Sequence, residues 1–414
     1  MVTHLRPRRP HRRPGLAVVI SRELWPHFSE GNAVTLLENG AEFFPALASA
    51  IDHAREEVFL ETYIFRDDRI GQMIAEALVR AAERGVIVSL LVDGFGSRDF
   101  VASHMTPLVE KGVRMLVYRR EVGRLLLRRH RLRRLHRKLA AIDGRVAFVG
   151  GINIVDDHNT ALPNHPRHDY AVRVEGPLLQ PIHDTTRRLW ELVAWASFRQ
   201  RLRLQDVATP RTDTAGHIRA AFVIRDNLRH RRDIETAYLQ AIDQAEREIV
   251  IANAYFLPGR RVRKALTAAA DRGVSVIILL QGRVEYALQH YATKALYPAL
   301  IRHGVRIFEY HRSFLHAKVA VIDGHWATVG SSNFDPFSLL LAREGNVIVR
   351  DTDFAGRLRE RLAAAMADGA AELEPQHWRR KALLTRALHW IAYGLVRAAV
   401  GLTGYAGERQ ANPR

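Results

Sequence analysis

Two segments of this 414-residue chain carry a histidine, a lysine and an aspartate at the same spacing. Both follow the pattern His-x-Lys-x4-Asp. The residues are His136, Lys138 and Asp143 in the first segment and His316, Lys318 and Asp323 in the second. Only six lysines occur in the whole chain, so two such matches indicate a duplicated catalytic motif rather than coincidence.

The spacing within each motif predicts chemistry on a phosphate. Residues two apart on a strand point to the same face, so the histidine and lysine of each motif project together. If the two motifs meet in one cleft, one imidazole can attack phosphorus while the other, protonated, delivers a proton to the departing oxygen. Lysine and asparagine side chains would stabilise the transition state, so we expect neither a metal nor another cofactor.

The aspartates, although part of the motifs, are expected to fix local structure more than to touch substrate. Asp143-Gly144 and Asp323-Gly324 are strong hairpin-turn sequences, each followed by an apolar returning strand. The returning strands end at residues 150–153 and 330–333, where backbone amides would lie near the histidine and lysine. The residues predicted to bind the phosphate in these segments are Asn153, Ser331 and Asn333.

Two further carboxylates are candidates for orienting the histidines. Asp169 and Glu344 follow the two motifs, and each could hold an imidazole through its second nitrogen; the alternative is a surface ion pair. Glu61 and Asn253 are the polar residues near the ends of equivalent strands, but they fall one position out of register. They are therefore predicted to point to opposite faces, and whether either lines the cleft stays open.

An internal repeat predicts the fold. Residues 50–65 resemble residues 241–256, and residues 81–94 resemble residues 268–282. Each copy combines helices with buried β-rich segments, and the copies are offset by about 190 residues. We therefore predict an α/β protein that is a tandem duplication of a βαβ-rich lobe, with the two lobes packed with pseudo-twofold symmetry.

The expected domains follow from the repeat and from composition. They are a basic flexible arm at residues 1–29, a first lobe at 30–205, a second lobe at 206–368 and a basic amphipathic tail at 369–414. Residues 121–134, which have no counterpart in the second lobe, carry six arginines. They form either a solvated helix face or a contact for phosphate headgroups.

The composition restricts partners and sites. Lysine and arginine number 62 against 44 aspartate and glutamate, a formal net charge of +18, which indicates an anionic partner. The absence of cysteine excludes disulfides, thiolate zinc sites and a cysteine nucleophile. No apolar run reaches 18 residues, but residues 382–406 are apolar and aromatic with basic neighbours. This pattern suits a helix in the membrane interface about as well as one docked on the protein.

At the two motifs the sequence resembles the phospholipase D superfamily, whose signature is this duplicated pattern followed by Gly-Gly/Ser-x-x-Asn. Within it the chain is similar to bacterial cardiolipin synthases of the short B type, for example in IANAYFLPG from Ile251 and HWATVGSSNFDPFSLLLAREGNVIV from His325. The resemblance implies phosphatidyl transfer between two phosphatidylglycerols, giving cardiolipin and glycerol. It also implies a phosphohistidine on His136, with His316 as acid and then base.

The resemblance further implies anionic phospholipid substrates and a peripheral location on the cytoplasmic face of the bacterial inner membrane. Neither nucleic acid nor an obligate protein partner is expected. Two alternatives within the superfamily are a phosphodiesterase, either phospholipase or nuclease, and phosphatidyl transfer to another alcohol. A third is a catalytically inert, basic membrane-binding protein, against which the two intact motifs count.

Overall fold

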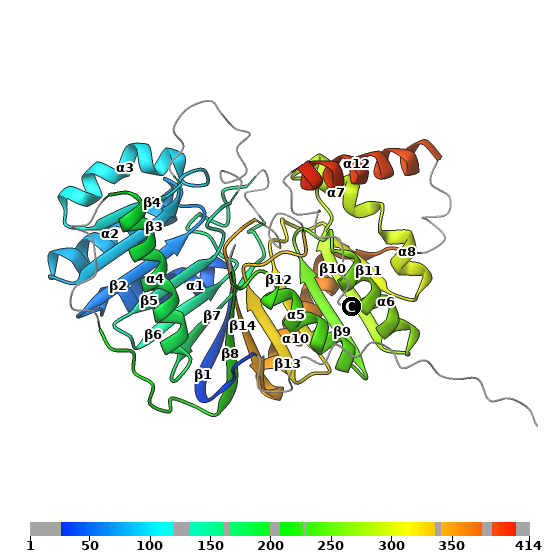
Figure 1. Ribbon diagram of the computed structural model, residues 1–414, viewed down its shortest axis with the longest axis horizontal. Coiled ribbons are helices and arrows are strands. Elements are labelled where there is room, and N and C mark those ends of the chain that lie inside the picture. The colour runs from blue at the N-terminus through cyan, green and yellow to red at the C-terminus, as the bar shows by residue number, and fades with distance from the viewer. Residues whose placement is uncertain are drawn as a thin grey trace, which may run out of the picture.

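One mixed sheet runs through both halves of the chain. The computed structural model describes residues 26–119, 133–160, 165–198, 208–226, 229–335, 341–374 and 383–402. Within them, 15 strands form the sheet in the order β15-β11-β10-β9-β12-β13-β14-β8-β1-β7-β6-β5-β2-β3-β4 (Figure 1). None of the helices in this part of the chain is long and apolar enough to cross a membrane.

In its described residues the first lobe contains seven strands and four helices. In chain order they are β1 (Ser29–Glu38), α1 (Asn39–Asp52), β2 (Glu57–Thr62), α2 (Arg69–Glu83), β3 (Ile87–Asp93), α3 (Arg98–Glu110), β4 (Arg114–Tyr118), β5 (Lys138–Ile142), β6 (Val146–Gly150), β7 (Tyr170–Glu175) and α4 (Leu179–Ala196).

The second lobe repeats this plan and adds elements at its end. They are β8 (Ile218–Arg225), α5 (Asp233–Gln244), β9 (Glu248–Asn253), α6 (Arg260–Asp271), β10 (Ser275–Gln281), α7 (Ala287–Lys294), α8 (Tyr297–Arg302), β11 (Arg306–Tyr310), β12 (Lys318–Ile322), β13 (Trp326–Gly330), β14 (Glu344–Arg350), α10 (Thr352–Gly369), β15 (Ala370–Glu372) and α12 (Leu383–Leu402).

The strand order is the same when read outward from the centre in either direction. From β1 it runs β7-β6-β5-β2-β3-β4, and from β8 it runs β14-β13-β12-β9-β10-β11. In both lobes the last three strands are parallel and the others pair antiparallel. This arrangement confirms the predicted tandem duplication with pseudo-twofold symmetry.

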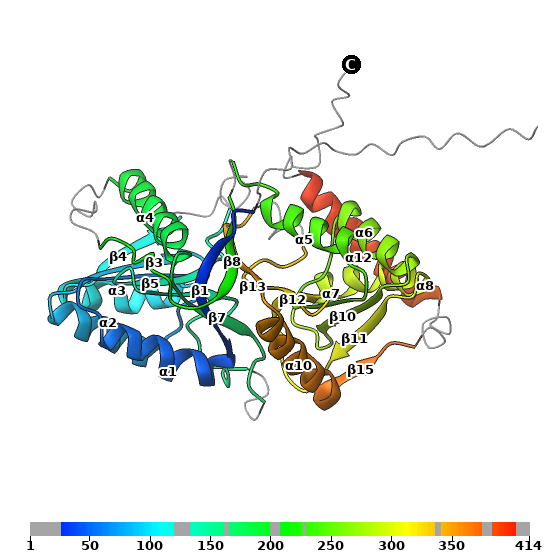
Figure 2. The ribbon, with the colours of Figure 1, turned by 90° about the horizontal axis from the view of Figure 1, so that it is seen from below.

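Local sequence explains why the shared elements form. Asp68 caps α2 by accepting a hydrogen bond from the backbone N–H of Gly71 at 3.0 Å, and Asp351 caps α10 through Phe354 N–H at 2.8 Å. Apolar runs such as SVIILLQ in β10 form parallel strands that are buried on both faces. Helices cover these faces: Figure 2 shows α1 and α2 on one side of the lobe-one strands and α4 on the other.

The two lobes also share a core beside the motifs. One apolar cluster joins Leu139 and Val149 of the first lobe to Val319 and Val329 of the second, and all four side chains are buried. Leu139 and Val319 directly follow the motif lysines at the starts of β5 and β12. The shared core therefore holds the two motifs against each other.

Some predicted segments fall outside the described residues. These are the basic arm up to residue 25, the arginine-rich segment up to residue 132, and residues 199–207 between the lobes. At the other end, β15 pairs antiparallel with β11. The second-lobe sheet thus continues beyond residue 368, where the sequence analysis placed the end of that lobe.

Candidate active site

Main-chain hydrogen bonds join the second lobe to the first just before β5. The backbone N–H groups of His136 and Arg137 donate to the carbonyl oxygen of Arg343 at 3.0 and 2.8 Å. Because Glu344 follows Arg343, its buried carboxylate reaches the imidazole of His136. Nδ1 of His136 lies 3.0 and 3.2 Å from the two carboxylate oxygens.

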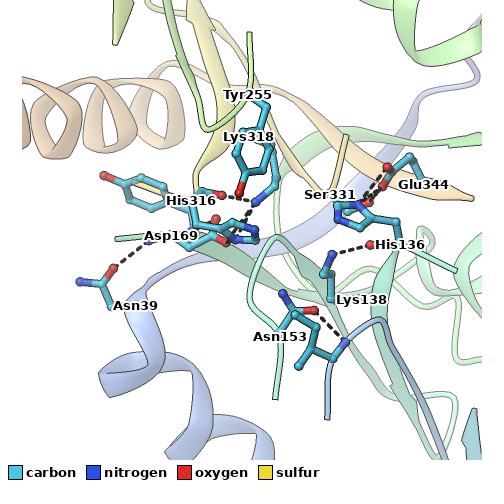
Figure 3. A network of polar contacts seen from close by, with 12 residues as sticks. Asn39, His136, Lys138, Asn153, Asp169, Tyr255, His316, Lys318, Ser331 and Glu344 are labelled. Atoms are coloured by element: carbon cyan, nitrogen blue, oxygen red, sulfur yellow. Dashed lines mark hydrogen bonds and ion pairs between the residues drawn. The ribbon is translucent and has the colours of Figure 1, made fainter. Parts of the chain in front are cut away.

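An equivalent main-chain hydrogen bond joins the first lobe to the second just before β12. His316 N–H donates to the carbonyl oxygen of His168 at 2.8 Å, and the next residue, Asp169, places a carboxylate oxygen 2.6 Å from Nδ1 of His316. Figure 3 shows the two histidine–carboxylate pairs close to each other. Each histidine is thus paired with the acid of the other lobe, which the sequence did not indicate. Both imidazoles keep Nε2 for a substrate, and 16% and 15% of their side chains remain exposed.

The two lysines lie in the same centre, one from each lobe. Both are buried; Nζ of Lys138 donates to the His136 carbonyl, and Nζ of Lys318 lies 3.5 Å from Asp169 and donates to the His316 carbonyl. Burial and the charge of Lys318 lower the pKa of Lys138 to about 7, and burial lowers that of Lys318 to about 8. Two cations this close favour an anion between them.

Burial also keeps the imidazoles neutral. It lowers the pKa of His136 and brings that of His316 to about 3, while the paired carboxylates act in the opposite direction. A neutral imidazole is the form that can attack phosphorus. An anionic phosphodiester placed between the histidines would raise both pKa values and permit the protonation that a general acid needs.

The segments after the returning strands carry the predicted phosphate-binding residues. Asn153 and Asn333 are buried, and Oδ1 of Asn153 accepts a hydrogen bond from Ile64 N–H at 3.1 Å. Ser331 lies behind Glu344 and donates to its carboxylate at 2.5 Å. The structure therefore places the Ser331 hydroxyl on the carboxylate that contacts His136, and Figure 3 shows this contact.

Comparisons with known proteins agree with this geometry. Residues 47–190 and 238–366 match the family described as "Cardiolipin synthase, PLD-like domain". Cardiolipin synthase B from Salmonella typhi is 40% identical over 355 residues, and the match covers 83% of each chain. The corresponding protein of Escherichia coli K12 is 39% identical with the same coverage. The chain belongs to the cardiolipin synthase family of the phospholipase D superfamily.

A solved structure shows the same fold. Phosphatidylserine synthase from Haemophilus influenzae superposes with a TM-score of 0.66 at 12% sequence identity, over 89% of this chain and 94% of that one. The agreement extends across both lobes. This family member therefore shares its two-lobed fold with that solved structure.

The motif aspartates are held in turns away from the histidines. Asp143 and Asp323 have positive φ angles of 51° and 52°, as the type of turn formed by Asp-Gly requires. Each accepts three backbone N–H bonds of 2.8 to 2.9 Å from residues just before and at the start of a parallel strand. The donors are Arg55, Glu56 and Glu57 for the first and Glu246, Arg247 and Glu248 for the second. These contacts agree with the expected structural role.

The two polar residues that are out of register occupy different surroundings. Glu61 forms a buried pair with Arg137, whose guanidinium also donates to a carbonyl of α4. Asn253 lies opposite Lys318 in the β9–β12 ladder, and its side-chain oxygen accepts from Phe334 N–H at 3.1 Å. Only Asn253 is therefore next to a motif residue in the sheet.

Sequence reasoning missed three side chains around the centre. The ring of Tyr63 lies 5.0 Å from the His136 imidazole, and Figure 3 shows Tyr255 beside Lys318. The charge of Arg167 contributes to lowering the pKa values of Lys318 and His316. The two tyrosines lie at the ends of the repeated segments, which was the available signal, and Arg167 comes two residues before Asp169.

No group of three or more histidine, aspartate or glutamate side chains suited to a metal ion is found in the described parts of the chain. The polar groups that converge here are two histidines, two lysines and two carboxylates. This set matches acid–base and nucleophilic chemistry on an anionic phosphodiester.

Proposed function

We propose that this member of the cardiolipin synthase family transfers a phosphatidyl group from one phosphatidylglycerol to a second one, giving cardiolipin and glycerol. The observation that carries the proposal is the pair of histidines, each oriented by the other lobe's acid, in a chain 40% identical to cardiolipin synthase B. Both halves of a two-step transfer then have their own acid–base group.

In the first step, Nε2 of neutral His136 attacks the phosphorus of phosphatidylglycerol. The P–N bond forms while the bond from phosphorus to the glycerol oxygen breaks. His316, protonated once the anionic substrate is bound, gives its Nε2 proton to that oxygen. The products of the step are free glycerol and a phosphatidyl group on His136.

In the second step, His316 acts as the base and the P–N bond is the one that breaks. Neutral His316 takes the proton from a hydroxyl of the second phosphatidylglycerol, and the hydroxyl oxygen attacks phosphorus. The P–N bond to His136 breaks as the new P–O bond forms. Cardiolipin leaves, and both histidines regain their starting states.

The surrounding residues serve these two steps. Glu344 and Asp169 accept the Nδ1 protons of His136 and His316, which fixes the orientation of each ring. Nε2 of neutral His136 is then free to attack, and Nε2 of His316 carries a proton when that histidine is charged. Lys138 and Lys318 neutralise the oxygens of the phosphodiester, together with the amides of Asn153 and Asn333. Ser331 acts through Glu344 as a positioning residue.

Lipid analysis by mass spectrometry after expression in a cardiolipin-free bacterium tests the proposal. Cardiolipin accumulation supports it. Phosphatidic acid in its place would identify water as the acceptor and the protein as a hydrolase, and a different phosphatidyl alcohol would identify another acceptor. Unchanged lipids, with the protein present and folded, would contradict any catalytic role.

Membrane association is part of the same proposal, since both substrates are lipids. Helix α12 docks on α7: Ala392 and Val396 are buried in a cluster with Ala292 and Leu296. Its other side exposes apolar residues, including Trp390 at 57% and Ile391 at 60%. We expect this exposed side to enter the headgroup region of the cytoplasmic face of the inner membrane.

A further inference from the structure

A second exposed apolar patch lies on the first lobe, at the end of α4. Leu192 is 47% exposed, Trp195 67% and Phe198 92%. Leu192 and Trp195 are three residues apart, on the side of the helix away from the buried Trp190 and Val193. We call these three residues the α4 tip. Nothing in the catalytic steps above uses them.

The α4 tip is close to the part of the first lobe that carries His136. The last turns of α4 contribute Leu189 and Trp190 to an apolar cluster with Tyr118 and Leu135. Leu135 directly precedes His136 in the chain. The hydroxyl of Tyr118 accepts a hydrogen bond from Arg343, the residue before Glu344, at 3.3 Å. The buried side of α4 near its end therefore packs against the segment that leads to His136, and the tip lies on the exposed side of the same helix end.

The buried side of α12 packs over residues that lead to the other half of the site. Leu257, in the cluster beneath α12, comes two residues after Tyr255, and the Tyr255 hydroxyl donates to Glu285 at 2.5 Å. The neighbouring Tyr286 and Leu288 are also exposed, at 58% and 49%. Figure 1 shows α7 and α12 together beyond the ends of β9, β10 and β11. One patch thus belongs to each lobe, with the site between them.

Charge near both patches is complementary to an anionic bilayer. The exposed Arg188 lies four residues before Leu192 on the same stripe of α4, and the exposed Arg397 lies on α12. The whole chain carries a net charge of +18. Exposed tryptophan and phenylalanine next to arginine is the composition that binds the interface of anionic membranes.

We propose that the α4 tip is a second membrane contact, which acts with α12 to fix the enzyme on the bilayer at two points. The inference rests on the proposed function for its lipid substrates. Two contacts on either side of the site hold the exposed edges of His136 and His316 towards the headgroups. A single contact would leave the protein free to pivot about it.

The test compares wild type with Trp195→Ser/Phe198→Ser, and uses Val109→Ser on α3 as a matched control. Val109 is also exposed, at 47%, but lies on neither patch. Sedimentation uses vesicles of phosphatidylserine and phosphatidylcholine, which contain no phosphatidylglycerol. We expect the double variant to bind about tenfold more weakly or worse, because two aromatic side chains no longer enter the interface. The control should bind as wild type does.

A second measurement separates this inference from the proposed function. With water-soluble short-chain phosphatidylglycerol, the double variant should turn over like wild type, because no bilayer is involved. With vesicles of long-chain phosphatidylglycerol it should be several-fold slower. If wild type fails to act on the short-chain substrate, the proposed function is wrong, whatever the sedimentation shows.

Equal vesicle binding by wild type and the double variant would overturn the two-point contact. A second result would also overturn it: wild type does not bind vesicles, and the double variant has a different oligomeric state from wild type. The α4 tip would then contact a second copy of the chain. Equal loss of rate on soluble and vesicle substrates would point to a folding defect. Circular dichroism of the double variant, expected to match wild type, checks that case directly.

Discussion

At the scale of single residues, each imidazole depends on a carboxylate from the other lobe. His136 contacts Glu344 and His316 contacts Asp169. The two pairs are not identical, because Ser331 supports Glu344 while the equivalent position beside Asp169 is Gly151. A Cβ atom at Gly151 would lie 2.3 Å from an oxygen of Asp169. Each lobe therefore has the residue that its own acid requires.

Replacing His316 with alanine should slow both steps by several orders of magnitude, because the acid that protonates the departing glycerol and the base that activates the second phosphatidylglycerol are lost together. The nucleophile is still present, so intact-mass analysis after prolonged incubation with substrate should show a phosphatidyl group gained slowly, at His136. His136→Ala should be equally inactive and unmodified. A phosphatidyl group on His316 would reverse the assigned roles.

Ser331→Ala should lower kcat by about tenfold with little change in KM, because Glu344 loses the hydroxyl that holds it on His136. Ser332→Ala is the matched control. Ser332 is equally buried, and its hydroxyl has no hydrogen-bond partner among the described residues. Steady-state kinetics across a pH series measures both variants. A Ser331→Ala enzyme with the wild-type rate and pH profile would exclude the positioning role.

The lysine pair predicts how stability depends on pH. The pKa of Lys138 falls from its ordinary 10.5 to about 7, mainly through burial, so the unfolded chain binds more protons between these values. The free energy of unfolding should therefore rise with pH in this window, and Lys138 alone contributes about 1 kcal/mol between about pH 8 and pH 9. Denaturant unfolding at several pH values measures the slope. The variant Lys138→Met/Lys318→Met should show a smaller dependence of unfolding free energy on pH. An unchanged slope would contradict the assignment of this dependence to the two lysines.

The sequence predicted the residues of the site better than their contacts. The motif spacing identified the histidines and lysines, and their position in the repeat identified Asp169 and Glu344. Which acid meets which histidine depends on main-chain bonds between lobes, such as His136 N–H to the Arg343 carbonyl. No periodicity within one lobe encodes such a bond. Ser331 was assigned to phosphate, and its contact with Glu344 likewise required the assembled fold.

At the scale of elements, the Asp-Gly turns connect hairpins to the parallel strands beside them. Asp143 sits in the β5–β6 turn and binds three N–H groups just before and at the start of β2. The turn thus fixes the register of β5, and with it His136 and Lys138, against β2. The sequence predicted the turn from Asp-Gly alone. It did not reveal the three donors, which lie more than 80 residues earlier in the chain.

Asp143→Ala should lower the free energy of unfolding by about 3 kcal/mol, since three backbone donors lose a charged acceptor. Activity per folded molecule should fall less than it does for the histidine variants. Glu110→Ala, at the exposed end of α3, is the control and should change stability little. Chemical denaturation monitored by tryptophan fluorescence gives the comparison. Equal stability of the two variants would show that the turn does not anchor β2.

At the scale of the whole molecule, duplication explains the arrangement of the two lobes but does not account for α12. The repeated segments predicted two equal lobes, and the strand order read outward from β1 and β8 is the same. Helix α12 has no partner in the repeat, so periodicity could not decide between the membrane and the protein surface. In the structure Ala392 and Val396 are buried on the protein, while Trp390 and Ile391 are exposed on the other side of the helix.

The last prediction concerns this helix. Trp390→Ser/Ile391→Ser should weaken binding to anionic vesicles at least several-fold, because the apolar side chains that enter the interface are lost. These substitutions leave the contact between α12 and α7 intact, whereas deleting residues after 375 would also uncover Ala292 and Leu296. Binding by wild type should fall with added salt, since arginines such as Arg397 are attracted to anionic headgroups across solvent. Vesicle sedimentation at two ionic strengths measures both effects, and salt-independent binding equal in wild type and variant would place the membrane contact elsewhere on the molecule.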